Sequence, residues 1–537
     1  MSELEPYLYQ AAAGCWDDTR RISRSSGRSS SAGPSNETSI RGSHEELLGG
    51  ITVDKSAWSN VTGFAAACSA ATINYHSLFL LPLSVVKNGG LAFLVLYSVL
   101  LVIIGAPLVL MEMFLGQYSS LAGVHIYYNI CPLMSGLGVA MYVTVIIRAV
   151  LNISVMVWVS RAVYDIFALL DTNMGLETIK DVAELQHQTP TVDGLFSLEY
   201  TELITLAVII VIMFVLAVGG VAAIGRICQL GLASSLLLMV TLTIRCCLSP
   251  SGGQAVKSLL APDWSHLTQP RVWLEAVVQV VMSLHLGLGV ISTYASHNGY
   301  SHNIVRDSVI VTSGHWVWSM VSTVLMSAML GMSQVSLTDI HGVMDCLVTA
   351  GRAMEVISQG WLWLGLVFIL VIIITINSTL GYITVIVSII PKLKLALATP
   401  ICLALLFFLS LIICNEAGPH IFLVISSHLT SWPPILFSLL SVLVLVWSHD
   451  LRYLESDLTS VTSMLLPHFI TSHLASLLYT FIPLSLAAGL YASIRNLVDS
   501  DKILLTSMTL PVVPIMIGAL IMTGRALRNY PRIVVSS

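Results

Sequence analysis

Polar side chains stand in the middle of two long apolar stretches of this chain. Residues 72–77 read Thr-Ile-Asn-Tyr-His-Ser, and residues 283–289 read Ser-Leu-His-Leu-Gly-Leu-Gly. Hydroxyl, amide, imidazole and backbone carbonyl groups of this kind can bind a cation or a small polar solute. No nucleophile–base constellation and no metal-binding spacing of cysteine and histidine accompanies them. The sequence therefore predicts a binding site rather than an enzyme active site.

The composition indicates what surrounds these polar groups. Of the 537 residues, 56% are hydrophobic and 10% are charged, and the mean hydropathy is +0.86. Soluble globular proteins contain about 25% charged residues. The formal net charge of −5 is small and does not favour nucleic acid as a partner. These values predict a membrane protein whose main partner is the lipid bilayer.

Apolar runs of about 20 residues, the length that crosses the hydrocarbon core, recur along the chain. They lack the alternation of barrel strands, and only helices or closed barrels can span lipid. The predicted fold is an all-α membrane protein with about twelve transmembrane helices. The runs cover residues 61–86, 91–115, 137–167, 202–220, 226–248, 273–296, 306–331, 361–388, 396–414, 420–447, 464–490 and 504–524.

The two ends of the chain are polar. Residues 1–50 include a stretch rich in serine and arginine, which cannot bury enough apolar surface to fold, so a disordered tail is expected there. The transporter-like membrane domain is expected at 51–525 and a short second tail at 526–537. Lysine and arginine are more frequent beside the spans on the side of both termini. The positive-inside rule then predicts that both termini are cytosolic.

The first and sixth spans have internal breaks in their apolar pattern. Glycines and polar groups weaken a helix at mid-membrane, and polar groups are costly in lipid unless they face a cavity. Paired breaks at matching places in two halves of a chain indicate the central site of a transporter. Because these spans are five apart, they predict a five-plus-five inverted repeat. Two kinked helices in an ordinary bundle are the alternative.

Several short motifs carry a family resemblance. Residues 87–93 read KNGGLAF, residues 105–108 read GAPL, and residues 111–118 read MEMFLGQY. With residues 263–284, which approach the sixth span, they resemble the neurotransmitter:sodium symporter family. The resemblance covers roughly residues 55–460. It implies secondary active transport of a small amino acid, amine or osmolyte at the plasma membrane, coupled to sodium and often to chloride.

The resemblance implies two sodium sites. In the second site, backbone carbonyls would come from Ala70, Ile73 and Ile374, and side-chain oxygens from Asn377 and Ser378. Asparagine replaces a family acid or threonine there, and its amide oxygen can still coordinate sodium.

The first sodium site is expected to be degraded. Thr72 would supply a carbonyl and Ser283 a hydroxyl, but Ser77 and His315 stand where the family has two asparagines. A hard cation prefers oxygen ligands, so an imidazole is a poor replacement.

The resemblance places four residues at the family's chloride-binding positions, and all of them carry hydrogen-bond donors. Ordinary hydrogen bonds between helices are the alternative explanation. The residues are Tyr97, Gln279, Ser283 and Ser319.

The substrate pocket is expected to be remodelled. The resemblance aligns Val155 with a tyrosine that binds the substrate carboxylate, and Asn74 with the aspartate of monoamine carriers. The residues expected to line the pocket are Asn74, His76, Val155, Ser283, Gly287 and Leu288.

The gates and the third span depart from the family as well. Leu80 and Ser426 replace the outer ion pair, and Lys55 and Lys392 stand at the inner one. Arg148 lies among apolar residues, where an arginine needs a partner or a path to water.

Two functions remain open on the sequence. The first is a secondary transporter with altered coupling, in which His76 and His315 could add proton coupling or could be packing residues. The second is a transport-inactive relative that acts as a scaffold or regulatory membrane protein. An unrelated carrier or channel is the third and least favoured alternative.

Overall fold

The computed structural model describes residues 58–169, 172–187, 199–299, 301–340, 342–390, 395–428, 432–448, 474, 476–498, 512–518 and 520–521. All regular secondary structure in these residues is helical. The expected tails at 1–50 and 526–537 lie outside the described residues.

The chain is an all-α, multi-pass membrane protein. Among the described residues, eight helices are long and apolar enough to cross a bilayer, or nine if one bent pair is counted as a single span. The unbroken spans are α5 (Leu91–Leu100) continued by η2 (Leu101–Gly105) and α6 (Ala106–Ser119), then α8 (Ser135–Leu169), α10 (Tyr200–Ala217), α11 (Gly220–Cys247), α15 (Ile304–Ser333), α17 (Gly360–Ser388), α18 (Leu395–Ser410) with η7 (Leu411–Ile413), and η8 (Leu477–Phe481) with α23 (Ile482–Val498).

The first and sixth spans are broken, as expected. The first consists of α3 (Val61–Thr72), a π-helical turn η1 (His76–Leu80) and α4 (Leu81–Lys87), with a 60° bend at the break. The sixth consists of α13 (Pro270–Ser283) and α14 (Val290–Ala295), separated by six residues without helical structure.

The tenth span differs from the single helix expected at 420–447. Two shorter helices, α19 (Gly418–His428) and α20 (Pro433–Ser448), cover this region. The paired prolines at the start of α20 lack backbone N–H groups, so they begin a new helix more readily than they continue an old one. Most of the expected twelfth span, 504–524, lies outside the described residues.

Shorter helices connect the spans. They are α7 (Gly123–Ile130), η3 (Pro132–Met134), α9 (Thr172–His187), α12 (Pro250–Leu259), η5 (Trp264–Thr268), η6 (Leu337–Asp339) and α16 (Val343–Glu355).

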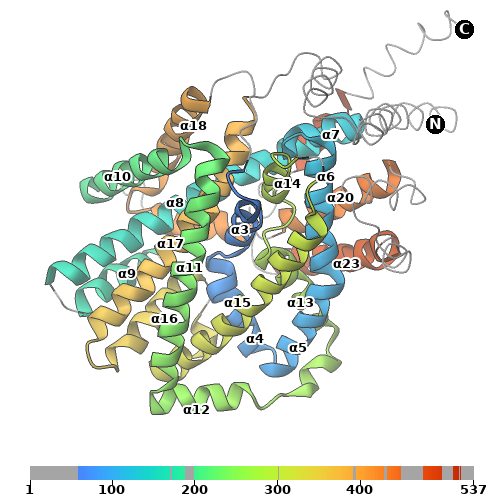
Figure 1. Ribbon diagram of the computed structural model, residues 1–537. Helices are drawn as coiled ribbons and strands as arrows, with labels where there is room; N and C mark the ends of the chain where they lie inside the picture. Colours follow the sequence, from blue (N-terminus) through green and yellow to red (C-terminus); the bar gives the residue numbers. More distant parts are fainter. Residues whose placement is uncertain are drawn as a thin grey trace, which may run out of the picture.

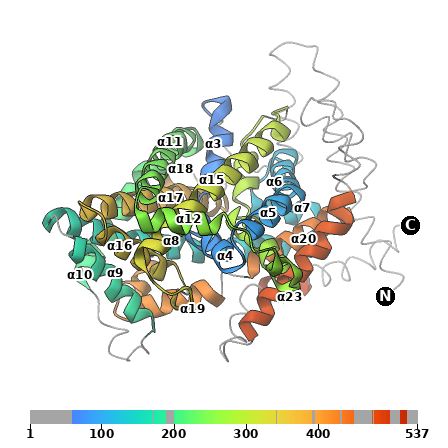
Figure 2. The same cartoon turned by 90° about the horizontal axis from the view of Figure 1, so that it is seen from below.

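The helix α3 lies at the centre of the bundle, where it contacts α11, α14, α15 and α17 (Figure 1). The third and eighth spans, α8 and α17, pack along each other beside it. In Figure 2, α20 and α23 lie on one flank of the bundle and α9, α10 and α16 on the other. The helix α13 packs against α20 and α23, and α18 packs against α10. The breaks in the first and sixth spans therefore meet in the interior. The inverted symmetry of the repeat stays a prediction.

Helix exposure follows position in the bundle. The most apolar windows of α8 and α17 are 78% and 72% buried, whereas those of α10 and α11 are each 22% buried. The open faces of α10 and α11 carry large aliphatic side chains, including Ile204 and Leu230. Aliphatic faces of this kind are suited to contact with lipid.

Two glycines shape the turn between α4 and α5. Gly89 and Gly90 have φ angles of +98° and +60°, a region that side chains with a Cβ rarely adopt. A Cβ at Gly89 would lie 2.8 Å from the Asp263 carbonyl oxygen, and one at Gly90 would lie 2.9 Å from that of Leu259. The two glycines of KNGGLAF thus allow this turn to pack against the segment that leads into the sixth span.

Candidate substrate and ion site

The first break folds around Asn74 and Ser77, which are both buried. The backbone N–H of Asn74 donates to Ser77 Oγ over 3.1 Å, and the N–H of Ser77 donates to Asn74 Oδ1 over 3.0 Å. The Ser77 hydroxyl donates in turn to the Asn74 carbonyl over 2.9 Å. These contacts replace hydrogen bonds that an unbroken helix would have made.

The Asn74 side chain also joins the first break to the second. Its Nδ2 donates to the carbonyl oxygens of Thr72 and Ser283, over 3.1 Å in each case. Thr72 ends α3 and Ser283 ends α13. Carbonyls at helix C-termini carry partial negative charge and lack a helical donor, so a single amide group satisfies two of them.

The helix α6 holds the second break through the MEMFLGQY motif. Glu112 Oε1 accepts a 2.6 Å hydrogen bond from the backbone N–H of Gly287 inside the break. A Cβ at Gly116 would lie 2.0 Å from the Ser292 carbonyl oxygen, so this glycine lets α14 approach closely. Gln117 Nε2 then donates to the carbonyl of His302 beyond α14. The motif is therefore a docking face for the second half of the sixth span.

The backbone of the second break is unusual at three places. Gly287 and Gly289 have φ angles of +75° and +72°, and His285 has a φ of +55°. A histidine in this region is strained relative to glycine. The Nδ1 atom of His285 lies 3.3 Å from the hydroxyl oxygen of Tyr382 on α17. This contact connects the second break to the eighth span.

Arg148 of α8 lies at the centre of the site and is 6% exposed. Its Nη2 contacts the Sδ atom of Met282 at 3.7 Å, and the guanidinium also hydrogen-bonds with Tyr382. It is close enough to act electrostatically on His76 and His285. The sequence left this arginine unexplained, and the structure places its guanidinium group next to α13 and α17.

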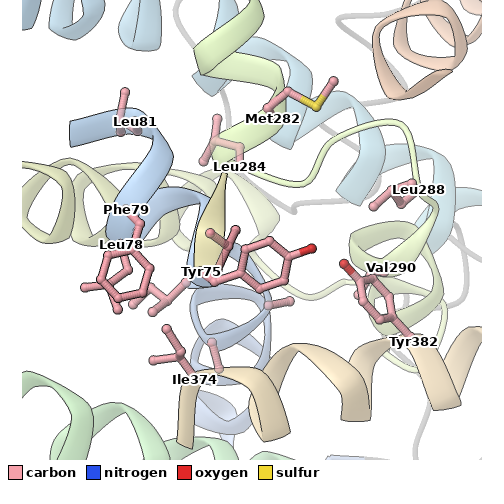
Figure 3. Packing of buried hydrophobic residues seen from close by; sticks show 14 of the residues in the cluster. Tyr75, Leu78, Phe79, Leu81, Met282, Leu284, Leu288, Val290, Ile374 and Tyr382 are labelled. Atoms are coloured by element: carbon pink, nitrogen blue, oxygen red, sulfur yellow. The ribbon is translucent and has the colours of Figure 1, made fainter. Parts of the chain in front are cut away.

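Buried side chains fill the space around the two breaks. Tyr75 and Tyr382 point toward one another from the first break and from α17 (Figure 3). Met282 and Leu284 lie at the end of α13, and Leu288 lies beyond it in the second break. All five are largely or fully buried. The site is therefore closed on all sides by protein in this conformation.

Most of the residues predicted to line the substrate pocket lie at the breaks. Asn74 is in the first break, and Gly287 and Leu288 are in the second, whereas His76 begins η1 and Ser283 ends α13.

Val155 is the exception among these predicted pocket residues. It is fully buried on α8. Seven residues are close to two full turns, so Val155 shares a helix face with Arg148 and lies about 10 Å further along the helix axis. Arg148, by contrast, contacts Met282 near the end of α13, next to the second break.

The residues predicted for the first sodium site come together, and most of their polar groups hydrogen-bond within the site or with Tyr97. The carbonyls of Thr72 and Ser283 accept from Asn74. The hydroxyl of Ser283 and the Nε2 atom of His315 contact the Tyr97 hydroxyl at 3.0 and 3.2 Å. Ser77 bonds to Asn74. These hydrogen bonds use oxygen atoms that a sodium ion would need, and the degraded first sodium site stays a prediction.

The second sodium site has a different character. Ala70 and Ile73 lie at the end of α3, next to α17, which carries the three other predicted ligands Ile374, Asn377 and Ser378. The Ser378 hydroxyl accepts a 2.9 Å hydrogen bond from Asn152 Nδ2.

The Asn377 amide of this site packs against a glycine of the fifth span. A Cβ at Gly231 of α11 would lie 2.5 Å from Asn377 Nδ2. The absence of a side chain at Gly231 therefore leaves room for the amide. Carbonyl, hydroxyl and amide oxygens are the ligand types that a hard cation prefers, and the second sodium site stays a prediction.

The four residues of the predicted chloride site fall into two groups. Tyr97 hydrogen-bonds with Ser283 and Ser319 in one group. In the other, Gln279 Nε2 donates to Ser84 and to Glu275, and its Oε1 lies 2.9 Å from His76 Nε2. The Gln279 donors therefore already have protein acceptors.

The positions predicted for the outer gate carry no charge. Leu80 ends η1, and Ser426 lies on α19 with its hydroxyl bonded to the Leu423 carbonyl. Lys55 and Lys392 lie outside the described residues.

Near the end of α8, Arg161 forms an exposed ion pair with Glu199, with 2.8 Å between Nη1 and Oε2. Arginine can reach toward the membrane surface in this way because its long apolar stem extends along the helix while its charged end stays near water.

Three residues that contribute to the site were not singled out from the sequence. Asn152 bonds to Ser378 and Thr379, while Tyr75 and Tyr382 face each other. Asn152 was visible as an amide in a long apolar span, which is a signal of function in a membrane protein. The tyrosines gave no such signal, since aromatic residues are common in buried helices.

This geometry defines a class of protein. Two discontinuous helices that meet inside a helical membrane bundle, with polar groups at their ends, are characteristic of secondary transporters. The chain belongs to the sodium:neurotransmitter symporter family, whose profile matches residues 55–182 and 178–527.

Individual relatives are distant. The chain is 23% identical over 458 residues to the sodium-dependent dopamine transporter of Bos taurus, a match that covers 76% of this chain and 65% of that protein. It is 24% identical over 431 residues to the sodium- and chloride-dependent taurine transporter of Homo sapiens, covering 70% and 68%. It is 24% identical over 466 residues to the sodium-dependent nutrient amino acid transporter 1 of Drosophila virilis, covering 75% and 72%. The chain thus spans about two thirds of the length of these relatives.

Proposed function

We propose that this chain is a secondary active transporter that moves a small organic solute across the membrane by alternating access, in symport with sodium. The observation that carries this proposal is the meeting of two broken helices, α3–η1 and α13–α14, around the Asn74 amide. Broken helices of this kind provide the backbone groups and the hinge that transport requires. The relatives named as sodium-dependent transporters support the same function.

Charge in the site favours one class of substrate. Arg148 supplies a buried positive charge, and the neutral Asn74 stands where a carrier of amine cations would need an acid. A guanidinium binds carboxylate and sulfonate groups well, often through two parallel hydrogen bonds. The substrate proposed is therefore an amino acid or osmolyte that bears an acidic group, rather than a simple amine. Taurine and nutrient amino acids, which name two of the relatives, belong to this class.

The second site, with Asn377 and Ser378, is the proposed binding place of the coupled sodium ion. Chloride is the proposed co-ion, because a taurine transporter and a GABA transporter among the relatives are named as sodium- and chloride-dependent. The proposed location is the plasma membrane with both termini in the cytosol.

Uptake into proteoliposomes tests the proposed function. The purified full-length protein would be given radiolabelled taurine, glycine, 4-aminobutyrate, leucine or dopamine under an inward sodium gradient, an inward proton gradient, or no gradient. We expect sodium-driven accumulation of at least one solute with an acidic group. Absence of uptake for every solute under every gradient would contradict transport, and dopamine uptake alone would contradict the substrate class.

Arg148 variants test the substrate class more directly. Arg148→Leu removes the charge. Arg148→Lys keeps the charge but lacks the planar guanidinium group that can form two parallel hydrogen bonds. Because Arg148→Leu removes a charged hydrogen-bond partner of the substrate, its uptake should fall by about tenfold or more. Arg148→Lys should retain part of the wild-type uptake. Arg161→Leu, at the exposed end of the same helix, is the matched control and should transport as the wild type does. Equal uptake by Arg148→Leu and Arg161→Leu would argue against a role for Arg148 in recognition.

A transport-inactive relative is the second candidate. The close packing of Tyr75, Met282 and Leu288 at the centre, and the neutral residues at the outer gate, favour it. In that case, cells that lack the protein should be rescued equally well by wild type and by Arg148→Leu. A combined variant with Ser77→Asn, His315→Asn, Leu80→Arg and Val155→Tyr, which reinstates family residues, should leave the cellular role unchanged.

A further inference from the structure

The Asn74 amide occupies a position between two helix ends that attracts positive charge. Its Nδ2 lies 3.1 Å from the Thr72 carbonyl oxygen and 3.1 Å from that of Ser283. These carbonyls terminate α3 and α13, whose C-terminal ends both carry partial negative charge. The side chain of Asn74 is only 1% exposed, so water does not neutralise this concentration of oxygen atoms.

The orientation of the amide follows from its neighbours. With Nδ2 facing the two carbonyls, Oδ1 accepts from the backbone N–H of Ser77 over 3.0 Å, and every contact joins a donor to an acceptor. A flipped amide would set its oxygen against two carbonyl oxygens and its NH₂ group against an N–H. The hydrogen-bond network therefore determines the orientation of the amide group.

The surrounding groups reduce the need for a further cation. Arg148 contacts Met282, the residue before Ser283, and so brings a fixed positive charge close to the end of α13. The Ser283 hydroxyl and His315 are both engaged with Tyr97.

We propose that the two N–H groups of the Asn74 amide replace a coupling cation between α3 and α13, so that the chain binds no sodium ion at this place. The amide performs the structural part of a cation's role, because it holds the ends of two broken helices together. Unlike an ion, it cannot dissociate, so it contributes no driving force to transport. The consequence for coupling rests on the proposed symport function, whereas the binding properties tested below do not.

Asn74→Asp is the sharpest test, since it replaces the NH₂ group by oxygen at almost constant volume. Two carbonyls and a carboxylate would then converge on one point, where the ionised carboxylate is stable only beside a cation. In sodium-free choline buffer we expect the melting temperature of the purified protein to fall by at least about 3 °C. Sodium should restore it in a saturable way, and equimolar potassium should not. Measurements in a Ser378→Ala background remove the contribution of the second sodium site.

Asn88→Asp is the matched control. Asn88 also donates its Nδ2 to a backbone carbonyl, that of Ser84, but it is only partly buried and faces a single acceptor. The same chemical change there should produce no sodium-specific rescue. An Asn74→Asp protein that melts at the wild-type temperature without sodium, or that gains no more from sodium than Asn88→Asp does, would overturn the proposal.

Direct binding to the wild-type protein covers the case in which Asn74→Asp does not fold. Equilibrium binding of ²²Na⁺ to the full-length chain should saturate at no more than one ion per chain, and Ser378→Ala should abolish it. Two ions per chain, or one that persists in Ser378→Ala, would overturn the proposal. Because neither measurement involves transport, a failed uptake experiment would leave this result interpretable.

Discussion

At the scale of single residues, the two helix breaks depend on a few polar side chains that replace missing helical hydrogen bonds. Asn74 and Ser77 close the first break on itself, and Glu112 holds the second through the N–H of Gly287. A buried donor without a partner costs roughly 1–3 kcal/mol. Each of these side chains therefore contributes more to stability than an average surface polar residue.

The Glu112 contact leads to a residue-scale prediction. Glu112→Ala would leave the Gly287 N–H buried without an acceptor and should destabilise the protein by about 1–3 kcal/mol. Glu112→Gln retains an acceptor oxygen and should lose less. The melting temperatures of the purified variants in one detergent check this order. If Glu112→Ala proves as stable as Glu112→Gln, the hydrogen bond to Gly287 does not support the break.

At the scale of helices, close approach between neighbouring elements depends on positions without a side chain. Gly116 admits the backbone of α14 against α6, and Gly231 of α11 admits the Asn377 amide of α17. Small residues play this role in membrane proteins, because lipid provides no hydrophobic force to bring helices together. The glycine in MEMFLGQY is thus explained by packing rather than by chemistry.

Gly116→Ala tests this helix contact. The added methyl group would meet the Ser292 carbonyl oxygen at 2.0 Å, so α14 or the second break must shift. Overpacking of this kind costs about 1–3 kcal/mol, which should appear as a lower melting temperature and reduced uptake.

Gly314→Ala on α15 is the control for this prediction, because nothing lies within 4 Å of its added Cβ. Alanine is also the better helix former, so this variant should be neutral or slightly stabilised. Equal behaviour of the two alanine variants would show that α6 and α14 tolerate a wider separation.

At the scale of the whole molecule, the spans differ in how much of their surface contacts other helices and how much is open to lipid. The core spans α8 and α17 are buried among other helices, while α10 and α11 present aliphatic faces outward. Lysine and arginine in the segments that flank the spans influence the orientation of a membrane protein. Topology can therefore be tested without knowledge of the substrate.

Epitope tags provide the whole-molecule prediction. Because the positive-inside rule puts both termini in the cytosol, tags at residue 1 or residue 537 should bind antibody only in permeabilised cells. A tag inserted into α12, which follows the fifth span, should be accessible in intact cells that express the protein at their surface. Labelling of an amino-terminal tag in intact cells would reverse the orientation.

The sequence by itself determined the class, the approximate positions of the spans and the location of the two breaks. These follow from local rules: a bilayer demands long apolar helices, and glycines or polar groups interrupt them. The tenth span shows the limit of such rules, since the apolar run at 420–447 did not reveal that α19 and α20 are separate helices.

Only the tertiary structure decided which groups meet. Asn74 bonds to the carbonyl of Ser283, 209 residues away, and Glu112 bonds to Gly287, 175 residues away. Such contacts depend on how far each helix is shifted along its axis, which periodicity does not specify. For the same reason the sequence marked Val155 through the family resemblance and Arg148 as a charge among apolar residues, while only the structure showed that Arg148 contacts Met282 of α13.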